Sequence, residues 1–126
     1  PLPGGEQHAG ESIEATALRE TSEELGLDLR AVRVLGRLTP LYIPPSNYCI
    51  YPTVAHVASP LEFRPQPEEV AEVIEPPVDH LAKPACVRRE TWHYGGQDHE
   101  VPFYEYGGHK IWGATAMVLA EFLAML

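Results

Sequence analysis

Three glutamates near the start of the chain have the residue type and spacing of metal ligands. Glu20, Glu23 and Glu24 recur at intervals of three residues and one residue, so on a helix, at about 100° per residue, they share one face. Like charges at such spacings repel each other, at about 0.2–0.5 kcal/mol per pair. A bound cation would relieve that repulsion, and Mg²⁺ and Mn²⁺ favour carboxylate oxygens. The alternative is an acidic helix face that only meets solvent.

A helix over residues 13–25 is predicted to position these glutamates. Ser12 is a suitable N-cap, and Gly26 is a suitable residue to end the helix. Ala17, Leu18 and other apolar residues lie on the adjoining arc, so the acidic face should border the core.

The rest of the chain alternates apolar runs with proline-rich and glycine-rich segments, which predicts a single α+β domain over residues 1–126. We expect loops over 2–10 and 39–47, strands over 32–39, 49–57 and 69–75, a helical turn at 78–82, a hairpin of 90–94 with 101–106, and a helix over 111–126.

Composition restricts the classes of function. The 126 residues include 18 acidic and 9 basic side chains, for a net charge of −9, which disfavours a nucleic-acid-binding protein. An anionic small molecule remains compatible if a divalent metal reverses the local charge. Cys49 and Cys86 have no metal-ligand spacing and are expected to be free thiols in a reducing cytoplasm. Neither a signal peptide nor a membrane span is predicted.

The acidic group belongs to a longer pattern. Gly5 is followed after five residues by Glu11, after seven more by Arg19-Glu20, and then by Glu23-Glu24 and Gly26-Leu27. This resembles the Nudix box, G-x5-E-x7-R-E-U-x-E-E-x-G-U, in which U is a bulky aliphatic residue. The only departure is Thr21 at the first U position.

The resemblance implies a Nudix α/β/α sandwich with a mixed sheet. It implies an Mg²⁺- or Mn²⁺-dependent pyrophosphohydrolase that cleaves the diphosphate of a nucleoside diphosphate derivative. The metal ligands would be Glu20, Glu23 and Glu24, with Glu20 and Glu24 favoured. Glu11 and Arg19 match the remaining charged positions of the box, and a pair between Arg19 and a carboxylate would brace the loop. Which glutamate acts as the general base stays open. The candidate bases are Glu23 and Glu24 within the box, and Glu69 or Glu72 in a later segment. Gly4 and Gly5 would turn the backbone beside the phosphates, and Tyr42 would contact the substrate. Gly26 is a structural residue of the motif.

Other segments resemble the coenzyme A pyrophosphatase branch of this superfamily. The chain contains Pro3-Gly4-Gly5 before the box and Ile111-Trp112-Gly113 with Thr115-Ala116 near its end. The branch implies cleavage of coenzyme A to 3′,5′-ADP and 4′-phosphopantetheine. Alternatives are ADP-ribose, a dinucleotide or a nucleoside triphosphate as substrate, or a Nudix fold that binds a ligand without turnover.

Two more expectations follow from the resemblance. The branch has an arginine-containing run before the box, whereas this chain begins at Pro1. We therefore expect the chain to lack one or more strands that precede the box. Homodimers are common in the superfamily, so a homodimer is a possible assembly.

Overall fold

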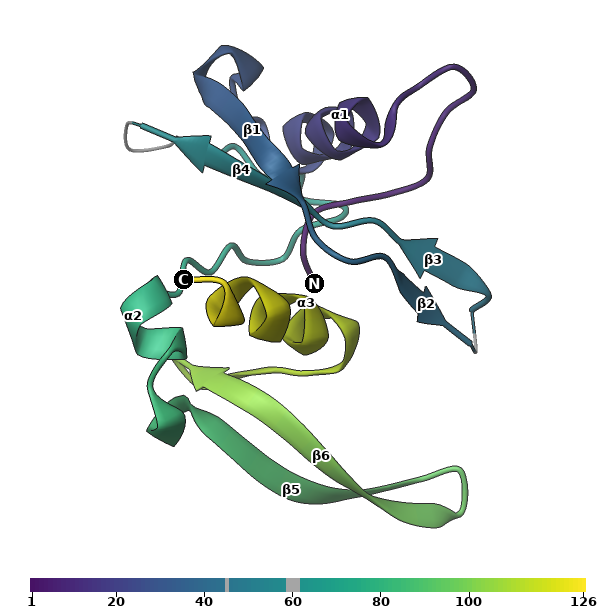
Figure 1. Ribbon diagram of the computed structural model, residues 1–126, viewed down its shortest axis with the longest axis vertical. Helices are drawn as coiled ribbons and strands as arrows, with labels where there is room; N and C mark the ends of the chain where they lie inside the picture. The colour runs from purple at the N-terminus through teal and green to yellow at the C-terminus, as the bar shows by residue number, and fades with distance from the viewer. Residues whose placement is uncertain (45, 59–61) are drawn as a thin grey trace. The chain divides into compact units, whose positions relative to one another are not determined.

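The acidic helix forms over the residues that the sequence predicted. The computed structural model describes residues 1–44, 46–58 and 62–126 (Figure 1). Helix α1 spans Ile13–Leu25, and a 3-10 turn over Leu29–Ala31 follows it. Residues 2–74 and 75–126 form two compact units, each described here by itself. Whether they make up a single domain stays a prediction.

In the unit of residues 2–74, α1 lies beside an antiparallel ribbon of β1 (Val32–Arg37) and β4 (Thr53–Val57) (Figure 1). The register shifts between Val34 and Gly36, which marks a bulge or irregularity in the ribbon. A second antiparallel ribbon pairs β2 (Leu41–Ile43) with β3 (Tyr48–Ile50). Apolar side chains of α1, β1 and β4 face one another across a small cavity that Leu18, Leu27 and Val57 help to line.

The unit of residues 75–126 is built on a long antiparallel hairpin. Its elements are α2 (Val78–Leu81), a 3-10 turn (Pro84–Cys86), β5 (Val87–Tyr94), β6 (Gln97–Tyr106), β7 (His109–Ile111) and α3 (Gly113–Ala124). Leu81, Cys86, Val101 and Phe103 are its buried apolar residues. Trp112 stays half exposed and packs edge-on against Trp92, with ring centroids 4.9 Å apart.

The α+β class is confirmed, but several predicted elements differ. The strand expected over 69–75 is wrong, because the backbone N–H groups of Glu69 and Val70 donate to Gln66 O and form a turn. The strand expected over 49–57 is divided at Pro52, whose nitrogen cannot donate to a ladder. The loop expected over 39–47 contains β2.

All strand pairings among the described residues are antiparallel, where a mixed sheet was expected. Residues 2–12 contain no strand. Cys49 and Cys86 are both free thiols, as predicted. Within the described part of the chain, no helix is both long enough and apolar enough to span a membrane.

Candidate active site

The two ends of α1 are fixed by the predicted caps. Ser12 Oγ accepts a hydrogen bond from Ala15 N–H at 3.1 Å. Gly26 adopts the left-handed conformation, with φ 66°, and donates its N–H to Ser22 O at 2.9 Å. Because glycine takes up this conformation without steric cost, the helix can end at Leu25. The caps therefore hold the acidic face in a defined position along the chain.

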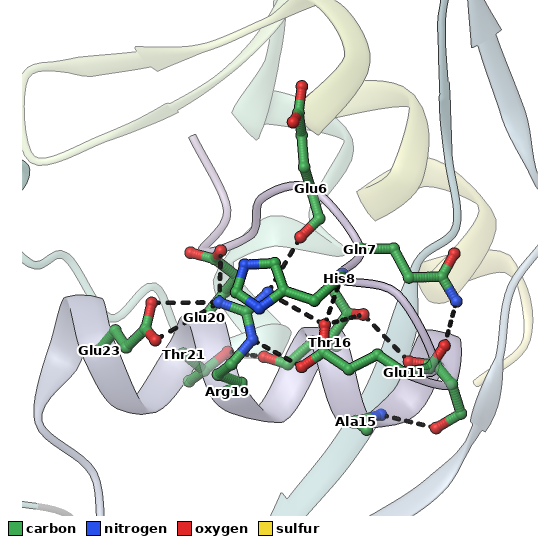
Figure 2. Close-up of polar contacts among 12 residues, drawn as sticks. Glu6, Gln7, His8, Glu11, Ala15, Thr16, Arg19, Glu20, Thr21 and Glu23 are labelled. Atoms are coloured by element: carbon green, nitrogen blue, oxygen red, sulfur yellow. Dashed lines mark hydrogen bonds and ion pairs between the residues drawn. The ribbon is translucent and has the colours of Figure 1, made fainter.

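Arg19 lies at the centre of a polar network (Figure 2). Its Nε donates to Glu11 Oε2 at 2.6 Å and its Nη2 donates to Glu11 Oε1 at 3.1 Å, a bidentate ion pair. Its Nη1 lies 2.9 Å from Glu20 Oε1 and 3.2 Å from Glu23 Oε2. Its Nη2 also donates to the backbone O of Glu6 at 2.9 Å. One guanidinium thus connects the loop before α1 to two of the predicted metal ligands, and its donors are already engaged by protein oxygens.

Glu11 accepts further bonds beside that ion pair. Its Oε1 accepts the backbone N–H of His8 at 2.8 Å and the hydroxyl of Thr16 at 2.9 Å. The Arg19 guanidinium, followed by the His8 N–H, lowers the pKa of Glu11 to about 2, and the pKa of Arg19 is raised, mainly by Glu11. Glu11 is therefore ionised at neutral pH and braces the loop to the helix, as the sequence predicted.

The glycine pair of the box lies against the acidic face. A Cβ atom built on Gly5 would stand 2.4 Å from both Cδ and Oε1 of Glu20. Only a residue without a side chain can approach the carboxylate so closely. The backbone of Gly4 forms a hydrogen bond with the carboxylate of Glu24. The two glycines thus bring the loop backbone to the metal-ligand candidates Glu20 and Glu24.

The pKa of Glu24 is raised above its ordinary value. Burial is the largest cause, and the negative charges of Glu20, Glu69 and Glu23 add to it, whereas the Gly4 hydrogen bond acts in the opposite direction. Four carboxylates are therefore close enough to influence one another. Glu69, chosen from the sequence as a later acid, belongs to this neighbourhood although it follows Glu24 by 45 residues.

A segment that the sequence reasoning missed brings Glu69 there. The backbone N–H groups of Arg64 and Gln66 donate to Leu25 O at 2.7 Å and to Glu24 O at 2.8 Å. They satisfy carbonyl groups that the last turn of a helix otherwise leaves unpaired. Gly26 permits this approach, since a Cβ on it would lie 2.6 Å from Arg64 O. Such a contact depends on backbone atoms and leaves no side-chain pattern by which it could have been found.

Tyr42, predicted as a substrate contact, bonds a residue between β2 and β3. Tyr42 is 54% exposed, and its hydroxyl donates to Asn47 Oδ1 at 2.7 Å. Among the described contacts, none joins Tyr42 to the acidic group, so its role as a substrate contact stays a prediction. Glu72 is exposed. Thr21, the departure from the box, donates its hydroxyl to Ala17 O at 2.7 Å and is half-buried beside the small cavity.

The donor set is compatible with a hard divalent cation. All of the candidate ligands are carboxylate oxygens, the donors that Mg²⁺ and Mn²⁺ prefer. The pKa of Glu24 is raised first by burial and then by the neighbouring negative charges, and a bound cation would oppose both effects. Within the described ranges, no three His, Cys, Asp or Glu side chains converge on one point, and Glu20 and Glu23 are instead held by Arg19.

Comparisons with known proteins agree with this geometry. The family model of the NUDIX domain matches residues 1–93. The chain belongs to the Nudix family. Members of this family generally use divalent metal ions.

Several curated Nudix proteins resemble the chain along nearly its whole length. It is 37% identical to the uncharacterized Nudix hydrolase NudL of Photorhabdus laumondii, over 95% of this chain and 64% of that protein. It is 38% identical to the human mitochondrial coenzyme A diphosphatase NUDT8, over 99% of this chain and 54% of that protein, and 36% identical to its mouse counterpart, over 99% and 61%. The chain therefore spans roughly half to two thirds of these relatives.

Proposed function

We propose that the protein is a divalent-metal-dependent Nudix hydrolase that cleaves the diphosphate bond of a nucleoside diphosphate derivative. The observation that carries this proposal is that the negative charges of Glu20, Glu23 and Glu69 all act on Glu24, while the Gly4-Gly5 backbone lies against Glu20 and Glu24. An excess of carboxylates of this kind is unfavourable without a cation. It is useful in a protein that must bring a metal to an anionic substrate.

In this proposal Glu20 and Glu24 hold the metal, together with Glu23. A bound divalent ion supplies charge neutralisation for the diphosphate and lowers the pKa of a water nucleophile. Glu23 must exchange its contact with Arg19 for the metal, and this contact is the longest of the Arg19 ion pairs at 3.2 Å. Arg19, whose donors are engaged with Glu11 and the loop, keeps the glycines against the carboxylates.

The water that attacks phosphorus must lose a proton to a nearby base as the bond to the leaving phosphate breaks. Glu24 is one candidate for that base, because it belongs to the same acidic group. Glu69 and Glu23 are the other candidates, because each influences Glu24 electrostatically. Glu69 is exposed and therefore accessible to a substrate water.

Coenzyme A is the substrate that we propose first, with 3′,5′-ADP and 4′-phosphopantetheine as products. Two relatives that match 99% of this chain are coenzyme A diphosphatases by name. Both relatives are named as mitochondrial proteins, so a cytoplasmic location of this chain stays a prediction. The homodimer also stays a prediction.

Hydrolysis by the full chain tests the proposal. The protein is incubated with Mg²⁺ or Mn²⁺ and separately with coenzyme A, ADP-ribose, dinucleotides and nucleoside triphosphates, and the phosphate-containing products are identified. We expect release of 3′,5′-ADP from coenzyme A that stops when the metal is chelated. Preference for another diphosphate would replace the substrate but keep the reaction. Binding without turnover on the whole panel would contradict the enzyme proposal.

A further inference from the structure

A tyrosine on the second β-ribbon contacts the loop that carries the box glycines. Tyr48, in β3, donates its hydroxyl to Glu6 Oε1 at 2.7 Å. The two residues are separated by 42 positions in the chain. The loop over residues 4–10 is here called the glycine loop. Apart from this bond, its described hydrogen bonds run to α1 or stay within residues 6–11. Tyr48 therefore ties the glycine loop to a different part of the same unit.

The bonded residue occupies a critical position in the glycine loop. The backbone O of Glu6 accepts a hydrogen bond from Arg19 Nη2 at 2.9 Å, while its side chain extends away from Arg19 (Figure 2). The preceding residue is Gly5, which packs against the Glu20 carboxylate. Glu6 is thus held from two sides, by Arg19 through its backbone and by Tyr48 through its side chain. Because both its backbone and its side chain are held, Glu6 has less conformational freedom, and so does the loop backbone next to it.

From these contacts we infer that Tyr48 is a positioning residue for the diphosphate chemistry, acting through Glu6 on the glycine loop. The inference rests on the proposed function. Tyr48 does not need to touch substrate or metal for this role. By limiting the freedom of Glu6, it keeps Gly5 against Glu20 and the Gly4 backbone bonded to Glu24.

The chemistry of the bond suits this role. A neutral phenol that donates to a carboxylate makes a charge-assisted bond, which is shorter and stronger than a bond between neutral groups. The pKa of Tyr48 is raised, chiefly by the hydrogen bond to Glu6 and then by its negative charge. The phenol thus stays protonated, and remains a donor, throughout the neutral range.

The test removes the hydroxyl and separates positioning from folding. We expect Tyr48→Phe to lower kcat roughly three- to tenfold, equivalent to about 0.7–1.4 kcal/mol, with KM and the fraction of folded protein little changed. Glu6→Ala should have the same effect, and the double variant should be no worse than either single variant. Glu6→Gln keeps an acceptor oxygen and should restore most of the rate. Tyr94→Phe is the matched control, since Tyr94 is similarly exposed at 53% and contacts His99 through its ring.

Amide hydrogen exchange of the glycine loop supplies a readout that does not need turnover. The bonds between His8 and Glu11 should open more often in Tyr48→Phe, so that exchange at these two amides becomes roughly three- to tenfold faster. Unchanged exchange would overturn the inference, and so would additive losses in the double variant. If the wild-type protein hydrolysed nothing, the proposed function would fail, while the exchange measurement would still decide whether Tyr48 holds the loop.

Discussion

The charged residues around α1 and those on the β5–β7 sheet are arranged in opposite ways. On the sheet, acids and bases alternate across the strands, so that Lys110 pairs with Glu90 and Arg88 pairs with Glu105. Around α1, several carboxylates share the single guanidinium of Arg19. Exposure differs in the same sense, since Arg19 and Glu11 are 22% and 18% exposed whereas Arg88 and Glu105 are 63% and 38% exposed.

The difference separates charges that serve solubility from charges that serve chemistry. Balanced, exposed pairs contribute little to stability. An unbalanced, partly buried group raises the pKa of Glu24 and lowers that of Glu11 in the same small region. Divergent pKa values of this kind are typical of functional sites. The experiments below test that contrast between the two regions.

Removal of one acid from the unbalanced group should have the largest effect. Glu24→Gln should lower kcat by roughly a hundredfold or more, because it removes a metal ligand and the candidate base with the raised pKa. The free energy of unfolding should rise slightly or stay unchanged, since a repelling charge is lost. Glu90→Gln, on the sheet, should leave the rate within about twofold of wild type. Steady-state rates and calorimetric Mg²⁺ binding check both, and full turnover by Glu24→Gln would refute the ligand assignment.

A methyl group on the glycine loop should have the next largest effect. Gly5→Ala places its Cβ 2.4 Å from Glu20 Cδ, so the carboxylate or the loop must move. A displacement of about 1 Å can cost on the order of a hundredfold in rate, and we expect a loss of about ten- to a hundredfold. Gly36→Ala, where a Cβ meets nothing within 4 Å, is the control. Equal rates for the two variants would show that the close approach of Gly5 has no catalytic role.

Substitution of the glycine at the end of α1 should reduce stability more than substitution of a glycine in the β5–β6 hairpin. Gly26 and Gly95 both have positive φ, 66° and 61°, so alanine at either position should cost about 1–2 kcal/mol. At Gly26 the new Cβ also meets Arg64 O at 2.6 Å, whereas at Gly95 it meets nothing within 4 Å. We therefore expect Gly26→Ala to be the more destabilising by about 1 kcal/mol or more, measured by urea unfolding. If both variants lost the same free energy of unfolding, Arg64 would not lie against the end of α1 in solution.

The smallest effect concerns acid stability. The folded-state pKa of Glu11 is about 2, below the ordinary value of 4.5, so its contribution is complete above about pH 4.5 and disappears as the pH falls through 2. The difference in unfolding free energy between wild type and Glu11→Gln should therefore shrink between pH 5 and pH 2. Glu100→Gln, whose partner Arg89 lies 4.0 Å away on the exposed hairpin, should show a much weaker dependence. A constant difference across this range would contradict the proposed pairing with Arg19.

The sequence predicted α1 well and the 69–75 segment wrongly, and the contrast has a physical cause. The bounds of α1 depend on local signals, a serine cap and a left-handed glycine. The alternating acids and apolar residues of 69–75 resemble a strand. The backbone just before them is instead bonded to the end of α1, where Gln66 N–H donates to Glu24 O, and Glu69 and Val70 donate to Gln66 O in a turn. A local sequence pattern does not show that the end of a distant helix will bond the backbone of this segment.

The sequence by itself determined the family, the acidic helix face and a brace between Arg19 and a carboxylate, because these depend on residue types at fixed spacings along one loop and one helix. Tertiary structure decided which distant residues join them. Glu69 approaches Glu24 because Arg64 and Gln66 bond the end of α1, and Tyr48 reaches Glu6 from β3. The first contact depends on backbone hydrogen bonds and the second on a bond between two side chains, and in both the partners are set by the fold rather than by spacing.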